Sequence, residues 1–112
     1  MDAAFLETLC VNLGPHAAED VVCRAMEELG QVLFQVHEIA VSGQREELHK
    51  TLRRLSAIAD QIGLCGLSDI ARDVMTCIEQ ADEVAEAATL ARLSRNGERS
   101  LAALWDLQDL SV

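Results

Sequence analysis

The sequence predicts an all-α protein, an antiparallel up-down four-helix bundle with a short additional N-terminal helix. Three observations lead to this prediction. Strand-favouring aromatic residues are scarce, since the chain has no Tyr, two Phe and one Trp, whereas Ala, Leu and Glu are abundant. Apolar residues recur at steps of three and four, the spacing of one face of a helix. Turn-forming residues then divide this pattern into segments.

The turn signals are Gly-Pro at 14–15, Ser-Gly at 42–43 and the segment between Gly63 and Gly66. They delimit five expected helices, which cover residues 3–13, 16–41, 45–62, 65–80 and 82–107. Short connections favour antiparallel neighbours, so the four long helices are expected to form the bundle. The short first helix would then cover one end or one flank of it.

One glycine falls inside the last expected helix. The apolar pattern keeps its phase from Leu93 through Gly97 to Leu101. A single Gly costs a helix only about 1 kcal/mol relative to Ala. We therefore expect this helix to continue without a break.

Length and charge limit the classes of function. The 112 residues fit one domain, residues 1–112, and with 50% hydrophobic residues the chain can bury a core. The formal net charge of −10 argues against nucleic acid and anionic membranes as partners, because both are polyanions. No stretch approaches the roughly 20 apolar residues of a membrane span, and no leader is evident at the N-terminus. We therefore expect a cytoplasmic protein.

The cysteines do not form a metal or redox motif. Cys10, Cys23, Cys65 and Cys77 are dispersed, and no C-x-x-C pair occurs. Each lies in an apolar run at helical spacing. We expect them to be small hydrophobic residues of the core in a reducing compartment.

The helix expected over residues 45–62 carries a polar stripe. His49 is followed by Arg53, Ser56 and Asp60 at +4, +7 and +11, so the four share one side of the helix. This side is turned away from the apolar residues Leu52 and Leu55. The stripe is expected to be exposed and available to a partner, although every amphipathic helix has a solvated face. With the flanking residues, the candidate binding set is His49, Lys50, Arg53, Ser56, Ala57 and Asp60.

The segment from Arg53 to Gly63 reads RRLSAIADQIG. It resembles the signature of histidine-containing phosphotransfer (HPt) domains, His-x-Leu-Lys-Gly followed by small residues and an aliphatic-Gly pair. Leu55 matches the aliphatic position, Ala57 the first glycine and Ile62-Gly63 the closing pair. Together with the order of the surrounding helices, the similarity covers residues 16–107. It implies a four-helix bundle that acts in two-component signalling.

Two positions depart from that signature. Arg53 stands at the phosphoacceptor histidine, and Ser56 replaces the usual lysine. Phosphoryl transfer needs a neutral imidazole nitrogen, whereas a guanidinium stays protonated and is no nucleophile. The resemblance therefore implies a pseudo-phosphotransfer protein without enzymatic activity, metal or cofactor. Its partner would be a response-regulator receiver domain or a histidine kinase, and Arg53 could pair with the acidic pocket of a receiver.

Two other functions stay open on the sequence. His49 lies one turn before Arg53 and could be a displaced phosphoacceptor in an active phosphotransferase. The chain could also be a helical scaffold that self-associates through its apolar stripes, and a monomer or weak homodimer is expected. A di-iron site is rejected, because Glu46-x-x-His49 has no second copy in the chain.

A hairpin of the second and third expected helices adds a second group of candidate residues. Folded about residues 43–44, it places Glu38 near His49 and Phe34 near Arg53, so that Glu38 could contact His49 or Arg53. Such a contact would be a purely structural role for these charges. The candidate binding residues contributed by the second helix are Gln31, Gln35 and Glu38. Trp105 near the C-terminus is expected to anchor the core or a fold-back tail.

Overall fold

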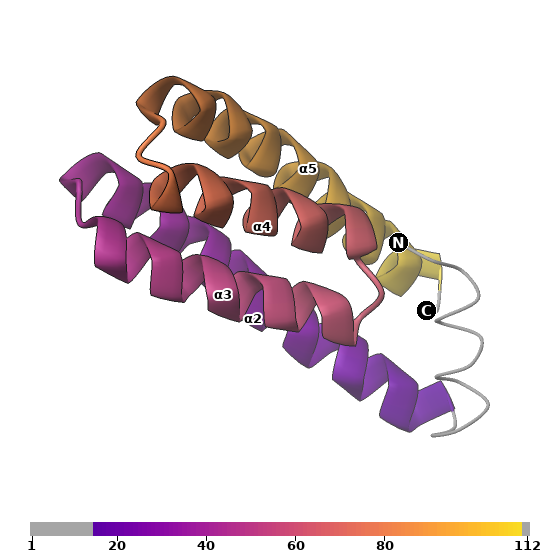
Figure 1. The fold of residues 1–112 in the computed structure, drawn as a ribbon. Helices are drawn as coiled ribbons and strands as arrows, with labels where there is room; N and C mark the ends of the chain where they lie inside the picture. Colours follow the sequence, from indigo (N-terminus) through magenta and orange to yellow (C-terminus); the bar gives the residue numbers. More distant parts are fainter. Residues whose placement is uncertain (1–14, 111–112) are drawn as a thin grey trace.

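The computed structural model describes the backbone of residues 15–110 and the side chains of residues 20–106. This part of the chain forms four helices (Figure 1): α2 Pro15–Ser42, α3 Arg45–Gln61, α4 Cys65–Glu79 and α5 Glu83–Leu110. Each helix packs against the next, and α2 also packs against α5. The arrangement confirms the prediction of an all-α four-helix protein with an up-down order. The helix expected over residues 3–13 lies outside the described residues.

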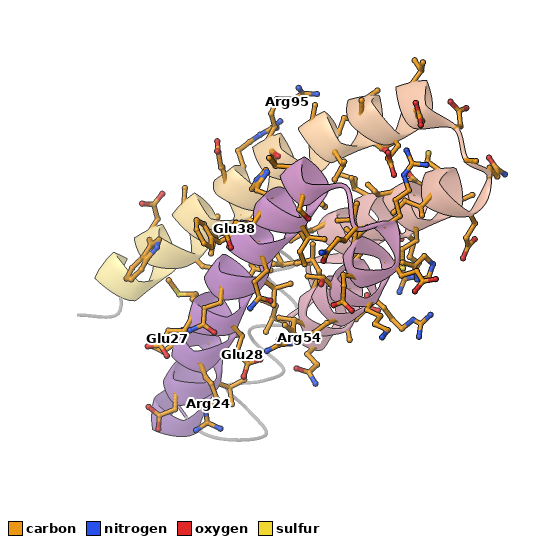
Figure 2. All side chains as sticks on the ribbon, turned by 90° about the vertical axis from the view of Figure 1, so that its left-hand side faces the viewer. Arg24, Glu27, Glu28, Glu38, Arg54 and Arg95 are labelled. Atoms are coloured by element: carbon orange, nitrogen blue, oxygen red, sulfur yellow. The ribbon has the colours of Figure 1, made fainter. Side chains whose placement is uncertain are left out.

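The helix boundaries agree closely with the sequence pattern. α5 runs through Gly97 without a break, as predicted, and its C-terminal end lies at Leu110 rather than at residue 107. None of the helices in residues 15–110 is long and apolar enough to cross a membrane. The outward side of α2 is charged, with Arg24, Glu27 and Glu38 exposed (Figure 2).

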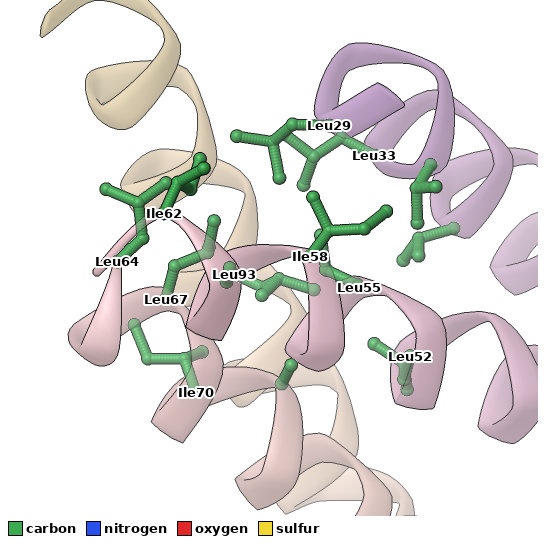
Figure 3. Close-up of a cluster of buried hydrophobic side chains, with 14 of the residues drawn as sticks. Leu29, Leu33, Leu52, Leu55, Ile58, Ile62, Leu64, Leu67, Ile70 and Leu93 are labelled. Carbon is green, nitrogen blue, oxygen red and sulfur yellow. The ribbon is translucent and has the colours of Figure 1, made fainter. Parts of the chain in front are cut away.

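The hydrophobic core lies between the four helices (Figure 3). Every helix contributes leucines to it: Leu29 from α2, Leu52 from α3, Leu67 from α4 and Leu93 from α5 are at most 1% exposed. Burying a leucine side chain stabilises a fold by about 2 kcal/mol, so these residues fix how each helix is rotated about its axis. The side chains that α3 presents to solvent therefore follow from the position of its leucines.

Close packing between α2 and α5 depends on Gly97. A Cβ atom built on this glycine would lie 2.9 Å from both methyl carbons of Leu33, so the Leu33 side chain occupies the space above it. One turn away, His37 Nε2 and Ser94 Oγ are 3.2 Å apart. These two contacts place residue 33 opposite 97 and residue 37 opposite 94, which is an antiparallel register.

The structure corrects the expected burial of the described cysteines and of Trp105 as a core anchor, whereas Cys10 lies outside the described residues. Cys65 is exposed, because it lies in the first turn of α4 on the side away from the core, and Cys23 and Cys77 are only partly buried. Trp105 is 58% exposed and is not a core anchor. Its neighbour Leu104 is fully buried and takes the core position of this turn.

The turns that end α3 and α4 have the same backbone hydrogen bonds. After α3, the amides of Gly63 and Leu64 donate to the carbonyls of Asp60 and Ala59. After α4, Ala81 and Asp82 donate in the same way to Ile78 and Cys77. Both are Schellman motifs, which need a residue in the left-handed region just past the helix. Gly63 has φ +75°, but Ala81 occupies the equivalent position with φ +55°.

Replacing Ala81 with Gly is expected to stabilise the protein by about 1 kcal/mol, because Gly adopts the left-handed conformation without the steric cost of a Cβ. The midpoint temperature of thermal unfolding should rise by roughly 4 °C. The matched change at the other turn, Gly63→Ala, should lower the unfolding temperature by a similar amount. Equal behaviour of the two variants in thermal denaturation followed by circular dichroism would contradict this account of the turns.

Candidate functional site

The exposed side of α3 is set by its buried leucines. Leu52 and Leu55 are fully buried, so residues on the opposite side of the helix point to solvent. Lys50, Arg53 and Ala57 are exposed there, as the sequence predicts. This part of the expected stripe is therefore free to meet a partner.

The rest of the stripe faces α4. His49 Nε2 lies 3.0 Å from Glu79 Oε1 near the start of α3. In the middle, Ser68 Oγ donates to the backbone carbonyl of Ser56 at 3.3 Å. Towards the end of α3, Asp60 Oδ2 accepts a hydrogen bond of 2.6 Å from Arg72. The polar residues of α3 thus form three contacts along the α3–α4 seam.

These contacts correct the predicted exposure of Ser56 and His49, whereas Asp60 is exposed, as predicted. Ser56 is buried, at 7% exposed, and its hydroxyl donates to the carbonyl of Arg53 at 2.8 Å. The side chain of His49 is only 21% exposed, and its partner is Glu79 of α4 rather than Glu38 of α2. The prediction failed because helical spacing identifies the side of α3 but does not tell which neighbouring helix covers its edge.

We call four residues of α3 the α3 face: Lys50, Arg53 and Ala57, which belong to the predicted set, and in addition Arg54. All four are exposed. Lys50 lies 3.9 Å from Glu47 of the preceding turn, a contact of little strength. Arg53 and Arg54 form no ion pair or hydrogen bond through their side chains with any described residue. Two unpaired guanidinium groups beside a small Ala make a cationic and sterically open surface.

Sequence reasoning missed Arg54. It follows Lys50 by four residues and adjoins Arg53, so its spacing already placed it beside this surface. The HPt signature gives no identity for the position after the phosphoacceptor, so the resemblance does not point to Arg54. Helical geometry puts Arg53 on the α4 side of Ala57 and Arg54 on the α2 side.

The candidate residues of α2 are at the surface but are not joined to the α3 face. Gln31, Gln35 and Glu38 are exposed and share one side of α2, since they are spaced by four and three. Among the described residues, no hydrogen bond or ion pair connects these side chains with α3. They can extend a binding surface, but they do not position Arg53.

The chemistry available on the α3 face is recognition of anions. A guanidinium presents several donors in a plane and pairs well with carboxylates. The α3 face contains no histidine, serine or cysteine that could act as a nucleophile. Within residues 20–106, no group of three or more His, Cys, Asp or Glu side chains is placed to hold a metal ion.

Comparison with known proteins adds no assignment, since no protein-family model, curated protein or solved structure matches the chain. The HPt resemblance therefore rests on the sequence motif alone. Leu55 and Ile62 are in the core, Ala57 is exposed and Gly63 has the left-handed conformation that its turn requires.

Proposed function

We propose that this protein is an HPt-like adaptor that binds the receiver domain of a response regulator without carrying a phosphoryl group. The binding surface is the α3 face, extended by Gln31, Gln35 and Glu38 of α2. A histidine kinase that contains a receiver domain presents the same chemistry and belongs to the same class of partner. The protein would occupy the receiver in place of an active phosphotransfer domain.

The proposal is supported mainly by the exposure of Arg53 and by its lack of an ion-pair partner in the part of the chain that the structure describes. Arg53 stands at the phosphoacceptor position of the motif, is exposed, and has no ion-pair partner among the described residues. Receiver domains present clustered carboxylates at their phosphorylation site, and an arginine reaching into such a pocket forms charge-assisted hydrogen bonds. The net charge of −10 opposes binding to an acidic partner, and the three cations of the α3 face relieve this repulsion locally.

The position of His49 counts against an active phosphotransferase. Its side chain is largely covered, and its Nε2 atom is 3.0 Å from the carboxylate of Glu79. An attacking imidazole nitrogen has to reach the phosphoryl group of another protein, which this contact hinders. The scaffold alternative needs no unpaired cations on α3, so it leaves the composition of the α3 face without a role.

The proposal is tested by filling the open site at Ala57. Receiver domains from the same cell are titrated into the protein, and binding is measured by calorimetry. We expect saturable binding of at least one receiver and a loss of about tenfold or more in Ala57→Trp, because a large ring prevents close approach of the partner. The matched control is Ala91→Trp on α5, which should bind as the unchanged protein does.

Two outcomes would contradict the proposal. One is that no receiver domain binds at concentrations up to those in the cell. The other is that Ala57→Trp and Ala91→Trp bind a receiver equally well, because the contact would then not involve the α3 face. Circular dichroism of each variant establishes that the helices are intact.

A further inference from the structure

A second exposed surface lies where α2 packs against α5. We call it the α2–α5 face and define it by six residues, three from each helix: Phe34, His37 and Val41, and Glu98, Leu101 and Trp105. On each helix the residues are spaced by three and four, so they follow one line along its axis. The α3 helix contributes nothing to this surface.

Contacts between the helices place the two lines one after the other along the seam between α2 and α5. His37 Nε2 lies 3.2 Å from Ser94 Oγ, and Ser94 precedes Glu98 by one turn. Leu33, which precedes Phe34, packs over Gly97. By this antiparallel register, Trp105 lies about 12 Å further than Phe34 along the seam, towards the N-terminal end of α2.

The α2–α5 face is unusually apolar for a solvated surface. Five large hydrophobic side chains are exposed among the described residues, and three of them belong to this face: Phe34 is 63% exposed, Val41 90% and Trp105 58%. Leu101 is partly buried between them. The core already contains a leucine in every helix, so stability does not explain two exposed aromatic rings. Clustered exposed apolar groups are typical of interaction sites.

The charges around this face decide between occupants. Glu27 and Glu38 are exposed beside it, and Arg95 is an exposed cation of α5 (Figure 2). Glu98, within the face, is also exposed. None of the four is ion-paired with a described residue. A second copy of the chain would bring like-charged carboxylates together, which costs free energy in an interface. A partner with lysine or arginine at its edges would neutralise them.

The spacing of the face indicates the shape of the partner. The large apolar residues of the face keep heptad spacing on each helix, since Val41 follows Phe34 by seven residues and Trp105 follows Leu101 by four. This is the period of 3.5 residues by which a further helix packs against a helical pair. We propose that the α2–α5 face binds a cationic amphipathic helix of another protein, with its apolar side on Phe34, Leu101 and Trp105 and basic residues over Glu27, Glu38 and Glu98. The α2–α5 face shares no residue with the α3 face, although Glu38 borders this face and also belongs to the surface proposed for the receiver.

Trp105 is the single tryptophan of the chain, so its fluorescence reports on this site directly. The probe is a synthetic peptide of about 18 residues, with leucine at heptad positions and lysine elsewhere, without aromatic residues. Binding should shift the emission of Trp105 to shorter wavelength and reduce its quenching by iodide. A peptide with glutamate in place of lysine should leave both unchanged.

Two substitutions remove apolar contacts and a third serves as their control. Phe34→Ser and Val41→Ser should each weaken peptide binding by about tenfold or more. Val21→Ser makes the same kind of change on the opposite side of α2, where Val21 is 37% exposed, and should leave affinity unchanged. All three variants are checked for helix content.

Three results would overturn the proposal. Equal responses to the lysine and glutamate peptides would show that charge does not select the partner. An equal loss in Val21→Ser would show that binding is not confined to this face. A dimer of the chain alone in sedimentation, dissociated by Phe34→Ser, would show that a second copy covers the face. Receiver binding by Phe34→Ser, measured in parallel, separates a failure of this proposal from a failure of the proposed receiver binding, because Phe34 is not part of the α3 face.

Discussion

Replacing Arg53 with Glu is expected to weaken binding of a receiver domain by about a hundredfold, or about 2.7 kcal/mol. The change removes a guanidinium that pairs with acidic groups of the partner and puts a carboxylate in its place. Loss of one partner of a close, desolvated charge pair costs about 2 to 5 kcal/mol in interfaces. Arg53→Ala removes the charge pair without adding repulsion. Its affinity for the receiver should therefore lie between those of the unchanged protein and of Arg53→Glu.

The control for Arg53→Glu is Arg92→Glu. Arg92 is exposed on α5, so its reversal changes the net charge of the chain equally but leaves the α3 face intact. Binding by Arg92→Glu should weaken only slightly, and that small loss should vanish as salt is added. Equal losses in the two variants would mean that net charge, and no specific contact at Arg53, governs association.

Among the substitutions that alter the free energy of unfolding, Gly97→Ala is expected to differ most from its control. A Cβ at this position would lie 2.9 Å from two carbon atoms of Leu33, which is 7% exposed and held by its neighbours. Overpacking of this kind costs about 1 to 3 kcal/mol, whereas removing a helical glycine gains about 1 kcal/mol. We expect a net loss of about 1 kcal/mol in urea denaturation.

The control for Gly97 is another glycine of the same pair of helices. A Cβ on Gly30 of α2 would have no atom within 4 Å, so Gly30→Ala keeps only the gain in helix propensity. It should stabilise the protein by about 1 kcal/mol, and the two variants should therefore differ by about 2 kcal/mol. If both glycines behave alike, the close contact of α2 and α5 at Leu33 is not a feature of the protein in solution.

Most of the fold could be predicted from the sequence, because the helices rest on local signals. The spacing of leucines gives the helical phase, and residues such as Gly43 and Gly63 mark where the chain turns. Gly97 was correctly kept inside α5 because one glycine cannot outweigh a long apolar stripe. Ala81 was not recognised as a turn residue of special geometry, since an alanine in the left-handed region leaves no signal in composition.

The candidate site could be predicted only in part. Arg53 and Ala57 are exposed, as their distance from Leu52 and Leu55 on the helix implies. Ser56 was assigned to the wrong environment because the edge of α3 is covered by α4, and pairing between distant helices cannot be read from periodicity. The exposure of Trp105 could not be predicted for a similar reason. It follows the buried Leu104 at the border of the apolar stripe, where periodicity does not decide whether a side chain is buried or exposed.

We propose that this protein binds a receiver domain without accepting its phosphoryl group. The direct test is to mix the protein with a receiver domain that carries a phosphoryl group. A receiver domain that binds is loaded with labelled phosphate, and acid-labile label is then measured on the unchanged protein and on His49→Ala. Our account predicts that the receiver binds through the α3 face and that no label reaches either protein. Label that appears on the unchanged protein and is lost in His49→Ala would contradict it, and would identify His49 as a phosphoacceptor displaced by one helical turn.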